Sequence, residues 1–431
     1  YCYPENPEAG IDLFLEKLVQ ETEKEHEDID ETDAMFGELY SWYLRNPEYR
    51  SRVQKLVQSA FAGKPEDIIS QSVAKALYGE VSPYSATRLE RFAACAFAHF
   101  LQYGMKLTER VEYEFKPMDM GNVMHEALES FAEEVRKRGM KWTELTEQER
   151  NEIADRCLDN IVADYGNTVL KSSARNEYMI ERTRRILRRT VWALQKQLEQ
   201  GEFQPEGFEV TFGGGRIDRV DIMEDQNKVY VKVIDYKTGN TSFDLVYLYH
   251  GLQLQLMIYL DGALRVEQKK YPDKEIIPAG VFYYNIKDPM IQEKIDADVE
   301  AVSAGLMKEL KMNGLVQADP ELVYRMDSSL GSIPVTFNKD GSFRKNSSVA
   351  DRTQFAVLGR YVRTKIEKIR SSILEGDAEV SPYELGKKNA CTYCPYMTVC
   401  GFDRRLSGYE FRRLKNFSDE ELWKAFDREA E

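Results

Sequence analysis

Hydrophobic residues recur at three- and four-residue spacing near the start of the chain. Ile11, Phe14 and Leu18 are examples, and this spacing places apolar side chains on one face of a helix. The pattern extends over residues 11–62. We therefore expect amphipathic helices there and an all-helical lead-in over residues 1–80.

A further helix has its own start signals. Ser82 and Pro83 precede a capping-box pattern, in which Thr87 is followed three residues later by Glu90. We expect this helix to run through Cys95 to about residue 103, and we expect more helices, with breaks, in the stretch that follows.

The pattern changes after residue 201, where apolar and polar residues begin to alternate. Alternation with a period of two is typical of strands. Residues 209–239 predict consecutive strands, with turns at the glycines of 213–215 and at the polar residues of 224–227.

The rest of the chain returns to helical spacing. A helix is expected over about residues 249–264, followed by a strand over about 277–284. The tail from Asp298 is mainly helical and is interrupted by a polar, turn-rich segment over 327–348. These elements predict an α/β fold with extensive helical additions.

Composition allows a large core and excludes some classes. The 431 residues are 42% hydrophobic, enough for more than one lobe. No window approaches 18 uncharged apolar residues, and the start YCYPENPEAG lacks a basic stretch followed by an apolar run. We expect a cytoplasmic protein with no membrane association. Since the chain opens with Tyr1, we expect it to be a piece of a longer polypeptide.

The formal charge of −14 argues against a surface covered in phosphate-binding residues, but it permits a local basic channel. One candidate is the run ERTRRILRR, where helical spacing gathers guanidinium groups on one side. Its candidate nucleic-acid contacts are Arg182, Arg185 and Arg189. The alternative is a solvated helix face, the commoner meaning of such a run in an acidic protein.

Two aspartates and a lysine carry the candidate chemistry. Phosphodiester hydrolysis needs a divalent cation and an activated water, and therefore acidic ligands that converge. Asp218 and Asp235 lie on consecutive predicted strands, and period-two geometry places Lys237 on the same face as Asp235. Oxygen ligands of this kind favour Mg²⁺ or Mn²⁺.

Three more residues extend this set. Gln255 and Tyr259 are four residues apart on the following helix and hence share a face. His125, one of four histidines, could complete a metal shell or contact DNA. Taken singly, these signals have plainer meanings, because an Asp-x-Lys pair is usually exposed and a lone histidine is usually structural. Their order along the chain favours a shared site.

In that order, four segments resemble the nuclease motifs of RecB-like exonucleases of the PD-(D/E)XK class: GNVMHEAL, GRIDRVD, VIDYKTG and LQLQLMIYL. The resemblance implies a restriction-endonuclease-like core, with a central mixed sheet flanked by helices, over about residues 118–290. It implies metal ligands at His125, Asp218 and Asp235, a water-positioning Lys237, and substrate-contacting or site-supporting groups at Gln255 and Tyr259. No motif position is visibly degraded, which argues against an inactive nuclease.

Three of the six cysteines are closely spaced, at Cys391, Cys394 and Cys400. This spacing is typical of metal or cluster ligands, and such sites normally use four soft ligands. The segment SPYSATRLERFAACAFAHFLQYGMKL resembles the AddB family pattern, in which one cysteine before the nuclease core and three after it hold a [4Fe-4S] cluster. The resemblance implies Cys95 as the fourth ligand, rather than Cys2 or Cys157. Ala96 departs from the proline that often follows this cysteine. Zn²⁺ is the competing occupant, and three incidental thiols are the plainest alternative.

The similarity to the C-terminal part of the AddB component of bacterial AddAB helicase-nucleases covers about residues 65–403. It implies a nuclease domain with a cysteine staple over 81–403 and leaves 404–431 as a helical tail. It also implies exonuclease action on single-stranded DNA during double-strand break processing, beside an AddA-type helicase-nuclease partner. Two alternatives remain: a CRISPR-associated iron-sulfur nuclease, which is usually shorter, and a non-catalytic DNA-binding or assembly module stabilised by a cluster.

Overall fold

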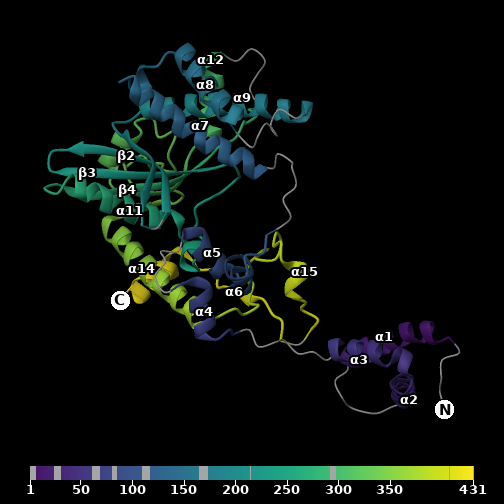
Figure 1. The fold of residues 1–431 in the computed structure, drawn as a ribbon. Coiled ribbons are helices and arrows are strands. Elements are labelled where there is room, and N and C mark those ends of the chain that lie inside the picture. The colour runs from purple at the N-terminus through teal and green to yellow at the C-terminus, as the bar shows by residue number, and fades with distance from the viewer. Residues whose placement is uncertain are drawn as a thin grey trace. The chain divides into compact units, whose positions relative to one another are not determined.

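The computed structural model describes residues 6–23, 31–60, 68–79, 85–108, 117–164, 173–213, 215–291, 298–406 and 408–430 (Figure 1). Cys2, Ser82 and Pro83 lie outside this part of the chain. The chain divides into two compact units. The first unit comprises residues 1–67 and 401–410, and the second comprises 68–400 and 411–431.

The first unit contains the helical lead-in. Its helices are α1 (Pro7–Glu23), α2 (Glu31–Arg45) and α3 (Pro47–Ala60). The apolar residues that recur at helical spacing form the core shared by these three helices, and Phe14 and Tyr43 are fully buried in it. Phe14 also stacks on Phe36, with ring centroids 5.0 Å apart.

The second unit begins with short helices whose start differs from the prediction. They are α4 (Gln71–Tyr78), α5 (Ala86–Ala94), α6 (Ala96–His99) and the π-helix η1 (Phe100–Gly104). Ser85 caps α5, since its Oγ accepts from Arg88 N at 3.4 Å, so the capping box of Thr87 and Glu90 is wrong. The continuous helix through Cys95 is also wrong, because Cys95 has extended backbone (φ −166°, ψ 118°) and separates α5 from α6.

A six-stranded mixed sheet forms the centre of the second unit. Its strands, in spatial order, are β1 (Gln204–Phe212), β2 (Gly215–Asp225), β3 (Lys228–Lys237), β4 (Glu275–Asn285), β5 (Asn313–Gln317) and β6 (Val349–Ala350). The β3/β4 and β5/β6 pairs are parallel, and the other neighbouring pairs are antiparallel. The expected mixed sheet flanked by helices is confirmed.

Helices cover both faces of the sheet (Figure 1). One face packs against α7 (Pro117–Lys137), the 3-10 turn η2 (Trp142–Glu144), α8 (Glu147–Asp164) and α9 (Ala174–Glu199). The other face packs against α11 (Gln255–Lys270), which follows the short helix α10 (Leu245–Tyr249), and against α14 (Arg352–Glu375), α5 and α16 (Asp419–Ala430).

Strand β3 shows how alternation sorts its side chains between the two cores. Tyr230 and Ile234 belong to the core under α7, α8 and α9, whereas Val231 and Val233 belong to the core under α11. The period-two geometry of the strand therefore turns Asp235, one residue past Ile234, toward the α11 side.

The remaining elements of the second unit lie after β4 in the sequence. They are α12 (Val299–Glu309), α13 (Pro320–Met326), α15 (Met397–Cys400) and a three-stranded sheet of β8 (Lys388–Asn389), β7 (Tyr383–Leu385) and β9 (Arg412–Arg413). None of the helices in the described ranges combines the length and apolar character needed to cross a bilayer.

A buried ion network lies on the α9 side of the sheet. The Arg219 guanidinium donates to both carboxylate oxygens of Asp221, at 2.5 and 2.9 Å, and Lys232 Nζ lies 3.0 Å from Asp221 Oδ2. Arg219 also lies over the rings of Trp142 and Phe208. The two cations hold the pKa of Asp221 below its usual value even though burial alone would raise it.

Candidate active site

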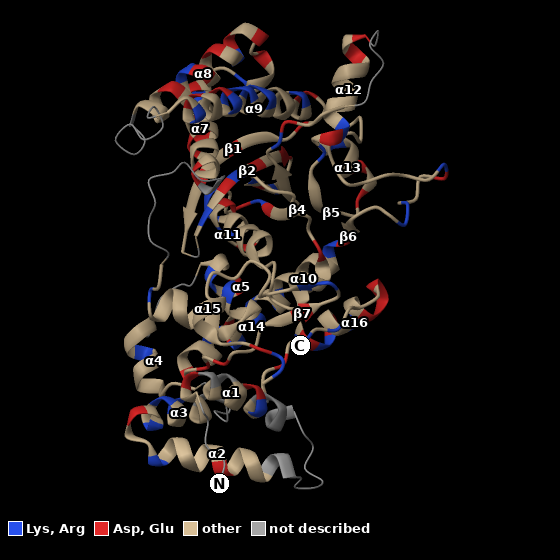
Figure 2. Cartoon of the chain, turned by 90° about the vertical axis from the view of Figure 1, so that its right-hand side faces the viewer, with Lys and Arg blue, Asp and Glu red and all other residues tan. Residues whose placement is uncertain are grey.

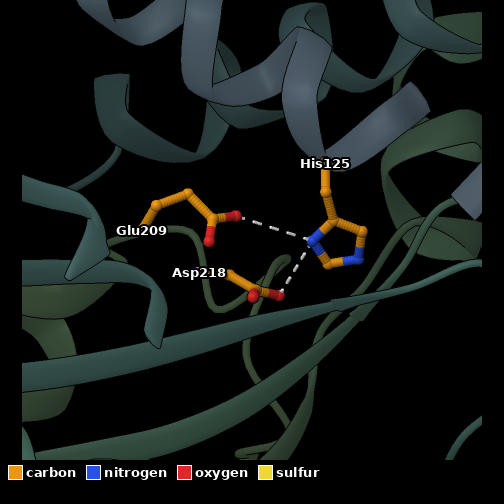
Figure 3. A group of neighbouring side chains, drawn as sticks. All are labelled: His125, Glu209 and Asp218. Carbon is orange, nitrogen blue, oxygen red and sulfur yellow. Dashed lines mark ion pairs between the residues drawn. The ribbon is translucent and has the colours of Figure 1, made fainter. Parts of the chain in front are cut away.

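Three side chains from different elements meet near the start of β2. His125 projects from α7 toward the sheet, Asp218 lies on β2 and Glu209 on β1 (Figure 3). His125 Nδ1 lies 3.3 Å from Asp218 Oδ2 and 3.9 Å from Glu209 Oε1. An imidazole nitrogen and two carboxylates at this separation can bind one divalent cation.

Glu209 was missed in the sequence, where its polar character fits an ordinary outward position on an alternating strand. Its neighbours Phe208 and Val210 pair with Arg219 and Ile217, so Glu209 lies opposite Asp218 across the two strands. Its φ of +49° is in the left-handed region, which is unfavourable for a residue with a Cβ. Such strain clusters at functional sites.

Asp235 and Lys237 lie at the end of β3, beside the first group. Asp235 is 1% exposed, and its Oδ2 lies 2.5 Å from Lys237 Nζ. The backbone N–H of Tyr236, the residue between them, donates to Asp218 Oδ2 at 2.7 Å. This bond joins the start of β2 to the end of β3, and Asp235 lies near enough to Asp218 and His125 to interact electrostatically with both.

The N-terminal turn of α11 holds the lysine from the other side. Lys237 Nζ donates to Gln255 Oε1 at 2.8 Å, and Gln255 Nε2 donates to Tyr259 OH at 2.9 Å. The two residues predicted to share a helix face therefore do so, and that face points at Lys237.

Glu90 on α5 is a second residue that sequence reasoning did not assign to the site. Its Oε1 accepts the backbone N–H groups of Leu254 and Gln255, at 2.7 and 2.9 Å. Its carboxylate is near enough to Lys237 and Asp235 to interact electrostatically with both. Glu90 and Leu254 are 164 residues apart, and no local pattern reports such a contact.

The electrostatics of the site show a local excess of negative charge. Burial, and then the Asp218 charge, raise the pKa of Asp235 to about 7. The same two causes raise the pKa of Glu209 to about 7. Burial lowers the pKa of His125, but the hydrogen bond to Asp218 and the surrounding carboxylates outweigh it and leave that pKa raised. Carboxylates this costly to ionise fit a divalent cation, which would stabilise their charged forms.

The four cysteines proposed as a set lie near one another. Cys95, at the end of α5, belongs to a small core with Tyr396 and Cys394. Burial, and then the charges of Cys95, Cys394 and Cys400, raise the pKa of Cys391 to about 12. A thiol that is this costly to ionise beside other cysteines is one whose thiolate a soft metal centre would stabilise.

The basic run lies on α9, along which Lys and Arg residues gather (Figure 2). Arg184 and Arg188 form ion pairs with Asp155, and Arg185 Nη2 lies 2.6 Å from Asp288. Arg189 lies over the Trp192 ring, 5.4 Å from its centroid. Of the three predicted nucleic-acid contacts, Arg185 and Arg189 line a hollow of about 640 Å³ between α8, α9 and α12, whereas Arg182 is exposed outside its lining.

Comparison with known proteins gives two findings. A family model described as the PD-(D/E)XK nuclease superfamily matches residues 83–401. The chain is also similar to curated relatives named as the B subunits of ATP-dependent helicase/deoxyribonucleases. The relative from Lachnoclostridium phytofermentans is 41% identical over 93% of this chain. The relatives from a Thermoanaerobacter species and from Clostridium acetobutylicum are 34% identical over 94% and 32% identical over 99% of it. The matched part is 36%, 37% and 39% of those relatives, so the chain spans little more than a third of their length.

Proposed function

Because the chain belongs to the PD-(D/E)XK nuclease superfamily and is homologous to the B subunits of ATP-dependent helicase/deoxyribonucleases, we propose that it is a metal-dependent exonuclease acting on single-stranded DNA. One observation carries the proposal. Three carboxylates, an imidazole and a lysine from α7, β1, β2 and β3 converge at one place on the sheet.

The residues divide the chemistry among themselves. His125, Asp218 and Asp235 would hold Mg²⁺ or Mn²⁺, with Glu209 as an additional ligand, and the cation would polarise the phosphate and lower the pKa of a bound water. Lys237 presents its ammonium beside Asp235 and positions the attacking water. Gln255 and Tyr259 hold that ammonium in place and face the substrate.

The cellular role extends this proposal. The name of the relatives couples a helicase to a deoxyribonuclease. We propose that this chain trims single strands at double-strand breaks in the cytoplasm, within a heterodimer whose AddA-type helicase-nuclease partner delivers the DNA. The chain would then supply one of the nuclease sites of that heterodimer.

The cysteine set is proposed to hold a [4Fe-4S] cluster, with Zn²⁺ as the competing occupant. Its ligands would be Cys95, Cys391, Cys394 and Cys400, whose thiols interact electrostatically. Joining Cys95 to cysteines about 300 residues later closes a large loop and constrains the unfolded chain. The cluster would therefore attach the region after α14 to α5.

The α9 side is proposed to contact DNA through Arg182, Arg185 and Arg189. The hollow beside α9 supports this, because Trp192 offers an aromatic face there and Arg150 lines it. Arg150 is 7% exposed, and its Nε has no hydrogen-bond partner in the described part of the chain. A buried guanidinium of this kind favours an anionic ligand.

The proposed activity is tested by Mg²⁺-dependent digestion of labelled single-stranded DNA. Asp235→Ala should abolish digestion and leave the fold intact, because it removes a metal ligand and the partner of Lys237. Asp340→Ala, which removes an exposed aspartate from a polar turn, is the matched control and should digest normally. Equal digestion by wild type and Asp235→Ala would refute the site, and a wild type without activity would favour the non-catalytic module.

A further inference from the structure

Helix α11 has no cap of its own at its first turn. The residue at its N-cap position is Leu254, which offers no side-chain hydrogen bond. The exposed N–H groups of a helix start need acceptors. Here one oxygen of Glu90, from the distant helix α5, accepts from both Leu254 N and Gln255 N, at 2.7 and 2.9 Å.

The anchored residue is the one that holds Lys237. Gln255 donates to Glu90 through its backbone N–H and accepts from Lys237 Nζ through its side chain, at 2.8 Å. Burial raises the pKa of Glu90 to about 7, and in its ionised form the carboxylate also attracts the ammonium of Lys237. Two routes, one through the start of α11 and one through space, therefore make the position of Lys237 depend on Glu90.

We propose that Glu90 is a positioning residue for Lys237, a role that rests on the proposed nuclease function. Glu90 fixes the backbone at the start of α11, and this fixes Gln255 and the lysine amine beside Asp235. A helix cap that served stability alone would not require its acceptor to lie within electrostatic reach of Asp235 and Lys237.

The same helix connects the site to the cysteine set. Glu90 lies on α5, and α5 ends at Cys95, a proposed cluster ligand. A cluster that holds Cys95 would therefore also hold Glu90 against α11. A cluster bound to the cysteine set would therefore help to position Lys237, in addition to constraining the unfolded chain.

The test compares Glu90→Ala and Glu90→Gln with Glu149→Ala. Glu149 is a matched control, because it also accepts a helix-start N–H, from Thr146 at 2.9 Å, but on α8 and away from the site. We expect Glu90→Ala to lower kcat roughly 10- to 100-fold, as removal of a supporting group commonly does, with KM for single-stranded DNA little changed. Glu90→Gln keeps an acceptor oxygen and should recover part of kcat. Glu149→Ala should match wild type.

A readout independent of activity is the rate at which an amine-reactive reagent labels Lys237, followed by mass spectrometry. Glu90→Ala should raise that rate roughly two- to tenfold, the factor that one net hydrogen bond contributes, and Glu149→Ala should leave it unchanged. Unchanged labelling, or a change in KM alone, would overturn the positioning role. Increased labelling in a protein whose wild type does not digest DNA would instead support the role and reject the nuclease function.

Discussion

The ionisation of Asp235 should make the metal-free protein less stable as the pH rises. Its pKa is about 7, against 3.8 for a solvated aspartate, chiefly because it is buried and faces Asp218. At 1.36 kcal/mol per pKa unit, the difference corresponds to about 4 kcal/mol. Since the folded-state pKa is the higher one, the stabilising contribution is fully present below about pH 4 and is lost as the pH rises through 7.

Asp235→Asn removes this titration while keeping the shape of the side chain. The assay is urea unfolding of both proteins in EDTA at pH 5 and pH 8. We expect wild type to lose about 2.7 kcal/mol relative to Asp235→Asn between these two values, because pH 5 lies two units below a pKa of about 7. At pH 8, Mg²⁺ should make wild type more stable than Asp235→Asn, because it binds the ionised carboxylates of wild type. This binding stabilises the folded state by about 2.7 kcal/mol at 100 times the Kd for Mg²⁺.

Asp340→Asn controls for the change of an aspartate elsewhere and should follow wild type at both pH values. If wild type and Asp235→Asn show the same pH dependence in EDTA, then Asp235 does not ionise at a cost in the folded protein. If Mg²⁺ stabilises both equally, then Asp235 is not a metal ligand. Either result would refute the reasoning from burial and charge.

Contacts outside that carboxylate give three further predictions. Asp221→Ala should lower the free energy of unfolding by about 3–5 kcal/mol in urea titrations, because Arg219 and Lys232 would remain buried without their countercharge; a loss no larger than that of Asp340→Ala would contradict this. The double variant Arg185→Ala/Arg189→Ala should bind single-stranded DNA more weakly and reduce the slope of log K against log salt by about 1.4, whereas the control Arg363→Ala should leave the slope unchanged. An unchanged slope in the double variant would exclude α9 from the interface. Purified protein should be brown, and Cys394→Ser should lose the colour while Cys157→Ser keeps it; a colourless protein containing zinc would identify the competing occupant.

The placement of Asp235 beside Lys237 was accessible from the chain because it depends on local geometry. Period two places Asp235 and Lys237 on one face of β3, and the structure has them 2.5 Å apart. The spacing of Gln255 and Tyr259 on a helix worked in the same way. The helix through Cys95 failed, because a residue with extended backbone interrupts it and no residue there is a helix breaker by composition.

The alternating pattern of β2 did not reveal that two of its charged residues are buried. In GRIDRVD the charged residues would be expected on an exposed face, yet Arg219 and Asp221 are 2% and 0% exposed. They are stable there because each is the other's partner and Lys232 from the neighbouring strand completes the set. Which charges pair across strands depends on register, and the order of residues along one strand does not contain it.

The amino-acid order alone predicted the strands and the helix faces from spacings of two, three or four residues, and the order of its motifs along the chain supplied the candidate site residues. Tertiary structure alone decided that Glu209 joins His125 and Asp218 and that Glu90 anchors Gln255. The first contact needs the pairing of β1 with β2 and a left-handed residue, and the second spans 165 residues. Contacts between distant segments arise only when the packed cores bring those segments together, and for that reason no short-range pattern encodes them.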